Sequence, residues 1–215
     1  MRNKFDMQLD ILNTQLTHMG ELCEIAINRV TRALQEEDVE QAREIIQADE
    51  EIDHMEKDIE RMCLKLLLQQ QPVARDLRQI SAALKMITDM ERIGDQTADI
   101  ADIVISAGIG KKNLPKIGDM AAGTAKMVRN SISAYVKRDL ELAKKVMEAD
   151  IAIDEIFDQI KTDLMRQIAT GEDDGEAIDL IMVAKYLERI GDHATNIAEW
   201  VEFSITGIHK GQQDL

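Results

Sequence analysis

Acidic residues recur in pairs spaced four apart, and the pairs belong to two copies of a repeated sequence. Residues 91–95 read ERIGD, and the same five letters return at residues 188–192. Four residues are about one helical turn, so the acids of a pair project from one face of a helix. The candidate metal-binding carboxylates are Asp49, Asp53, Glu91 and Asp95 in the first copy, and Asp150, Asp154, Glu188 and Asp192 in the second.

Carboxylates gathered in this way repel one another, which raises their pKa values unless a cation joins them. A set of oxygen ligands suits hard ions such as ferric iron, manganese, magnesium or calcium, and favours zinc less because Cys and His ligands are lacking. Two other interpretations stay open. The acids could be ordinary solvated faces, or Arg92 and Arg189 could neutralise them as ion pairs. We interpret His54 and His193, which lie beside the acids, as structural or solvent-facing imidazoles.

The repeat extends well beyond the ERIGD segment. Residues 85–104 align with 182–201 at an offset of 97, and residues 38–53 match 139–154 at an offset of 101. The second copy has therefore lost four residues between its two blocks, and we predict the loss in a connecting turn. Gly94 and Gly191 lie inside the repeated segment, where glycine disfavours helix by about 1 kcal/mol relative to alanine. Glycine at both positions therefore indicates that a neighbouring group packs closely against the helix backbone there.

Apolar residues at heptad spacing predict helices throughout, and the chain lacks the alternating runs of a strand. We expect an all-α fold of two tandem three-helix bundles, residues 1–107 and 116–215, joined by a linker at residues 108–115. The expected helices cover residues 5–35, a second segment ending near 69, a third from about 72 to 108, and then 116–137, 139–169 and 175–206. Antiparallel packing would bring Asp53 level with Glu91 and Asp154 level with Glu188, so that four acids converge in each bundle.

Charge and composition exclude several classes of protein. The formal net charge of −15 would repel a phosphate backbone, so we expect no nucleic-acid partner. No apolar run reaches eighteen residues and the first ten residues contain no apolar signal core, which predicts a cytoplasmic protein. Cys23 and Cys63 form no Cys/His cluster and are predicted to be reduced thiols in the core.

The two ERIGD copies, the segment ERIGDHATNIAE at 188–199 and PVARDLR at 72–78 resemble the PhoU family of phosphate-specific transport system accessory proteins. The resemblance implies a cytoplasmic, usually dimeric regulator that couples a high-affinity phosphate ABC transporter to a sensor histidine kinase. Such a regulator represses the phosphate-starvation response when phosphate is ample. The resemblance also implies that the eight acids hold multinuclear clusters of iron or of another metal.

The sequence departs from the family pattern in two places. Gln96 and Asp99 of the first copy stand where the second has His193 and Asn196, so equal metal occupancy of the two sites is in doubt. The second half also lacks a counterpart of PVARDLR, so the two bundles need not offer partners the same surface.

An enzyme is the rival interpretation. A ferritin-like, carboxylate-bridged metal oxidase needs two Glu-x-x-His motifs, and only residues 51–54 match one. The sequence also contains no nucleophile-base pair and no glycine-rich phosphate loop. A third interpretation is a structural helical adaptor without metal. We predict a non-enzymatic negative regulator of phosphate uptake, homodimeric and peripheral to the membrane only through its protein partners.

Overall fold

The computed structural model describes residues 2–70, 73–107, 114–172 and 175–208, and these residues form six helices and no strand. The helices are α1 (Arg2–Glu36), α2 (Val39–Gln70), α3 (Ala74–Ser106), α4 (Leu114–Lys137), α5 (Leu140–Thr170) and α6 (Ala177–Thr206). The all-α prediction is confirmed, and the helix limits differ from the expected ones by a few residues. The division at 107 and 116 stays a prediction, and residues 108–113 of the linker lie outside the described ranges.

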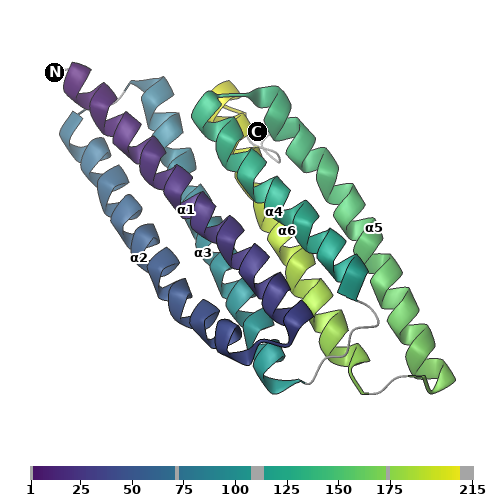
Figure 1. Cartoon of the computed structure of the whole chain (residues 1–215). Helices are drawn as coiled ribbons and strands as arrows, with labels where there is room; N and C mark the ends of the chain where they lie inside the picture. The colour runs from purple at the N-terminus through teal and green to yellow at the C-terminus, as the bar shows by residue number, and fades with distance from the viewer. Residues whose placement is uncertain (1, 71–72, 108–113, 173–174, 209–215) are drawn as a thin grey trace.

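The helices form two antiparallel three-helix bundles that stand side by side (Figure 1). Helices α3 and α6 form the most extensive contact between the bundles, α1 packs on α4, and α2 and α5 lie on the outer sides. The buried apolar side chains form one core that runs through both bundles, with Ile93 and Ile190 fully buried. Within the described part of the chain, no helix has the length and apolar character needed to cross a membrane.

The two cysteines lie in this core as free thiols, as predicted. The Cys23 thiol donates a hydrogen bond of 3.4 Å to the carbonyl oxygen of Met90. Burial, followed by the nearby Asp49 carboxyl, raises the pKa of Cys23 to about 12. A thiol of this kind is not ionised at neutral pH and is therefore a packing group rather than a nucleophile.

The duplication is visible in the backbone of the two short turns between the first helices of each bundle. Glu37 and Arg138 occupy matching positions and both adopt the left-handed conformation, with φ of 59° and 53°. The next residue then caps the following helix. Asp38 accepts a hydrogen bond of 2.9 Å from the amide of Gln41, and Asp139 accepts one of 3.0 Å from the amide of Leu142.

The four residues missing from the second copy are not missing from a turn, so that part of the prediction is wrong. In the repeat, Ala177 at the start of α6 corresponds to Ile80, which lies well inside α3. The turn before α6 is in fact the longer of the two. The first bundle thus has extra helical turns at the start of α3, and these turns carry Arg75 and Arg78.

Candidate metal centre

Three of the predicted carboxylates converge in the first bundle. Asp49 and Asp53 project from α2 and Asp95 projects from α3, and one oxygen atom from each lies within 4.8 Å of the others. Glu91, one turn before Asp95, is outside this close group but near enough to raise the pKa of Asp49. The predicted antiparallel register therefore brings the two pairs of acids together.

Asp49 is the most perturbed acid of the cluster. Burial is the largest cause, and repulsion from Asp95, Asp53 and Glu91 adds to it, so the pKa of Asp49 rises to about 7. Its Oδ1 atom is buried and accepts no hydrogen bond from the residues that the structure describes. A buried carboxylate oxygen without a donor is costly, and a bound cation would remove that cost.

Gly94 makes room for this carboxylate. A Cβ atom at residue 94 would overlap Asp49 Oδ1 and would lie 3.1 Å from Cδ1 of Ile52. In the second bundle the same contact is looser, because a Cβ atom at Gly191 would lie 3.2 Å from Asp150 Oδ1. The predicted close approach at the repeated glycine is thus an approach by the acid of the neighbouring helix.

The second cluster contains its own cation. The Lys185 ammonium lies 2.5 Å from Oε2 of Glu188, three residues later on α6. The pKa of Asp150 is raised to about 6, first by burial and then by Asp154 and Asp192. Among the described residues, no three acids of this bundle converge as closely as those of the first. Thr88 occupies the position of Lys185 in the first copy, so among the described residues only the second cluster has a lysine in direct contact with one of its acids.

The arginines of the ERIGD segments do not neutralise the clusters directly. No ion pair between described residues joins Arg92 or Arg189 to these acids, although Arg92 lowers the pKa of Asp95 from a distance. Arg189 instead lies over the ring of Tyr186, 6.0 Å from its centre. The ion-pair alternative is therefore not what the described side chains form.

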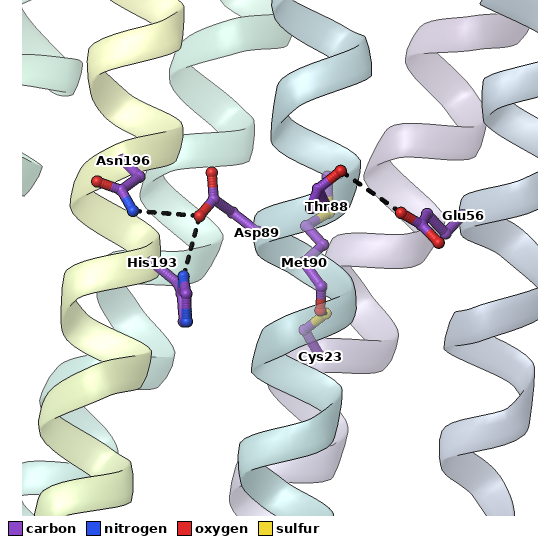
Figure 2. A network of polar contacts seen from close by, with 7 residues as sticks. All are labelled: Cys23, Glu56, Thr88, Asp89, Met90, His193 and Asn196. Carbon is purple, nitrogen blue, oxygen red and sulfur yellow. Dashed lines mark hydrogen bonds and ion pairs between the residues drawn. The ribbon is translucent and has the colours of Figure 1, made fainter.

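His193 links the two bundles. Its Nδ1 atom lies 2.9 Å from Oδ1 of Asp89, and the Asn196 amide donates to the same oxygen at 3.1 Å. Figure 2 shows Asp89 turned from α3 toward α6, whereas the adjacent Thr88 is turned toward α2. His54, by contrast, is exposed and contacts the carbonyl oxygen of Glu50 on its own helix. In this structure His193 makes a contact between the bundles and His54 is exposed, and their assignment as groups that do not bind metal stays a prediction.

Comparison with known proteins agrees with this architecture. The PhoU domain model matches residues 16–104 and again residues 117–201. A phosphate-specific transport system accessory protein PhoU homolog of Clostridium acetobutylicum is 35% identical over 211 residues, 96% of each chain. The chain belongs to the PhoU family. The crystal structure of PhoU from Pseudomonas aeruginosa has a TM-score of 0.88 and 30% identity, covering 95% of this chain and 100% of that one.

A PhoU homolog of Aquifex aeolicus is 36% identical over 189 residues, 86% of each chain. The structure of a phosphate transport system regulatory protein PhoU from Streptococcus pneumoniae, 24% identical with a TM-score of 0.89, supports the PhoU fold alone. It covers 98% of this chain and 100% of that one.

The two repeated segments of this PhoU-family chain face each other across the junction of α3 and α6. An open groove of about 490 Å³ between the helices is lined by Arg92, Asp95, Gln96, Arg189, Asp192, His193 and Asn196. One acid of each proposed metal site therefore borders the same groove. Sequence reasoning did not single out Lys185 or Asp89, and only the i,i+3 spacing of Lys185 to Glu188 offered a signal.

Replacing Gly94 with Ala tests the close approach at the first cluster. Alanine favours helix by about 1 kcal/mol, but overpacking against the Asp49 carboxylate and Ile52 costs about 1–3 kcal/mol. We expect Gly94→Ala to lower the free energy of unfolding in urea by about 1 kcal/mol and to weaken cation binding in the first bundle. Gly191→Ala is the matched control and should be nearly neutral. Equal effects of the two substitutions would contradict the packing that we describe.

Proposed function

We propose that this protein is a negative regulator of phosphate uptake and of phosphate-starvation signalling. It acts through contacts with a high-affinity phosphate ABC transporter and a sensor histidine kinase. The observation that carries the proposal is the similarity along nearly the whole chain to proteins named as accessory to phosphate-specific transport. In this proposal the protein is cytoplasmic, forms a homodimer and reaches the membrane only through those partners.

The acid clusters are the second part of the proposal. The eight carboxylates would hold hard cations, in multinuclear clusters of iron or as manganese, magnesium or calcium. The orphaned Oδ1 of Asp49 and the convergence of three carboxylates support this donor set for the first bundle. A bound cation supplies positive charge that holds the carboxylates together. The acids of α2 and α3 would then fix the relative position of these helices and the surface that they offer to partners.

No catalytic role is proposed. An oxidase of the ferritin-like type would draw ligands from two Glu-x-x-His motifs, and the single matching histidine, His54, is exposed and contacts its own helix. Nucleic acid is not a proposed partner, since the net charge is −15. The adaptor without metal is distinguished from this proposal by elemental analysis of protein purified without chelators.

A deletion strain tests the regulatory role. Without the protein, phosphate-responsive genes should stay active in phosphate-rich medium, because nothing restrains the transporter and kinase. A reporter gene under a phosphate-controlled promoter measures this. Complementation with the Asp49→Asn, Asp95→Asn double variant should restore repression poorly. Asp58→Asn, which changes an exposed acid paired with Arg61, should restore it fully.

Two outcomes would count against the proposal. Repression that persists in the deletion strain, with no second copy of the gene present, would reject the regulatory role. Full repression by the double variant, at equal protein level, would leave the regulator intact and remove the acid cluster from its mechanism.

A further inference from the structure

Three arginines gather at one end of this acidic molecule. Arg75 and Arg78 lie at the start of α3, and Arg138 lies in the turn between α4 and α5 and contacts the carbonyl oxygen of Ser204 near the end of α6. Figure 1 shows the start of α3, the turn between α4 and α5 and the end of α6 at one end of the molecule. Arg138 contacts Gln79, the residue after Arg78, and the Arg78 side chain lies against Gly207 at the end of α6, three residues after the Ser204 carbonyl that Arg138 contacts. Burial lowers the pKa of the Arg138 guanidinium, and repulsion from Arg75 and Arg78 adds to that change. We call these residues the arginine cluster.

The hydrogen-bonding capacity of the arginine cluster is mostly unused. Arg138 donates from Nη1 to Oε1 of Gln79 and from Nη2 to the carbonyl oxygen of Ser204, both at 3.5 Å, the long limit for such bonds. The Nε atom of Arg78 is buried and has no hydrogen-bond partner among the described residues. No ion pair among the described residues includes Arg75, Arg78 or Arg138. Guanidinium groups with free donors are suited to a planar or tetrahedral oxyanion.

The duplicated fold shows that the structure does not require these charges. Arg138 corresponds to Glu37, which has the same left-handed backbone and the opposite charge. In the ERIGD alignment, Arg75 corresponds to Glu172, which lies in the turn before α6 and not in a helix. The symmetry-related position, made of Glu37 from the first repeat and Glu172 from the second, is therefore acidic. The first repeat has the extra start of α3 that places Arg75 and Arg78 beside Arg138.

Backbone groups at the same place add to the positive potential. The amide of Leu77 is the first of α3 to bond within the helix, to the carbonyl of Val73, and the Val73 side chain gives no cap. The amides of residues 74–76 are therefore available to an anion at a helix terminus. Within the described part of the chain, Asp76 in the first turn opposes them, and Asp139, the residue after Arg138, already caps α5 with its carboxylate.

The overall negative charge does not prevent an anion from binding here. Asp95 lies twenty residues along α3 from Arg75, which is roughly 30 Å at 1.5 Å per residue. Physiological salt screens charges beyond a Debye length of about 8 Å. Among the described side chains at this end, the three guanidiniums outnumber Asp76 and the engaged Asp139.

We propose that the arginine cluster and the start of α3 form a binding site for a phosphate-class oxyanion, separate from the acid clusters and independent of metal. Arg75 and Arg138 would bind the oxyanion through their guanidinium donors, and the neighbouring Arg78 would add positive charge. The site would give the protein a direct contact with inorganic phosphate that its metal centres do not provide.

Calorimetric titration of inorganic phosphate into the full-length protein tests this site, both as purified and after removal of metal by a chelator. We expect saturable binding in both states that weakens as salt rises. Arg75→Gln and Arg138→Gln should each weaken binding about tenfold, the loss of one charge-assisted contact. Arg75→Lys should weaken it less, because lysine keeps the charge and loses the fork of donors. The control is Arg61→Gln, which removes an exposed arginine outside the cluster.

Three results would overturn the proposal. The first is no saturable binding by the unmodified protein. The second is unchanged affinity in Arg75→Gln, a variant whose exposed side chain leaves the core intact. The third is binding that disappears with the metal and is insensitive to both arginine variants, which would assign the phosphate to the acid clusters. None of these results bears on gene repression in the deletion strain, so the regulatory role is tested separately.

Discussion

Asp49→Asn is expected to make the metal-free protein more stable at neutral pH and to abolish the extra stability that a cation confers on the first bundle. The ionised carboxylate of Asp49 is half-buried, repelled by its neighbours and without a donor for Oδ1. Asparagine removes the charge at nearly the same volume. Because water partly screens the repulsion, we expect a gain of about 2 kcal/mol in the free energy of unfolding rather than the full value of the pKa shift.

The raised pKa of Asp49 determines how the stability of the metal-free protein changes with pH. The pKa of Asp49 rises from an ordinary 3.8 to about 7 in the folded protein, so the folded state binds the proton more tightly than the unfolded state. This contribution to stability is fully present below pH 3.8 and is lost as the pH rises through about 7. Metal-free protein should therefore lose stability between pH 4 and pH 7, and Asp49→Asn should lose less.

Urea unfolding with and without manganese, at pH 5 and pH 7.5, measures both parts of the prediction. Asp150→Asn is the matched variant in the second bundle and should show a smaller gain, since the pKa of Asp150 rises only to about 6. A destabilised Asp49→Asn protein that still gains full stability from manganese would show that Asp49 is a structural group and not a cation ligand.

The fold could be predicted because it depends on patterns that repeat along the chain. Heptad spacing determines which face of each helix is buried, and short connections between long helices require antiparallel neighbours. The residues in the two matching turns, Glu37 and Arg138, share one backbone conformation despite opposite charges, since the Asp that follows each one caps the next helix. The repeat pattern could not place the four residues that the second copy lacks, because the start of a helix and a turn differ little in composition.

The candidate site was predictable as a set of acids but not as two unequal clusters. Equal spacing placed Asp49 and Asp150 in equivalent positions, and the helix register brought their partners to the same level. Whether a carboxylate is neutralised within the protein depends on the rotation of each helix and on its neighbours. The Lys185–Glu188 pair lies within α6, so its i,i+3 spacing was visible in the sequence. Asp89 meets His193, in contrast, only because α3 packs against α6. No periodicity in one sequence records such contacts between helices.

Exchanging one residue between the two repeats should reverse their preference for cations. Thr88 and Lys185 are equivalent in the duplication, and only Lys185 supplies a positive charge to its cluster. Lys185→Thr should strengthen binding in the second bundle about tenfold, because the cation no longer competes with an ammonium group. Thr88→Lys should weaken binding in the first bundle by a similar factor. Both substitutions are near the surface of their helices, so the fold should be retained.

Manganese titration with two resolved binding steps measures the exchange, with Asp49→Asn and Asp150→Asn used to assign each step to a bundle. Thr162→Lys adds the same charge at an exposed position of α5 outside both sets of acids and is the control for net charge. If Lys185→Thr left the second step unchanged while Thr88→Lys weakened the first, the ammonium of Lys185 would be a partner of Glu188 alone. If the affinity of the second step rose and that of the first step fell, as expected, the difference between the clusters would arise from a single residue in the repeat. The gene duplication would then have produced a site that requires a cation and another that carries its own.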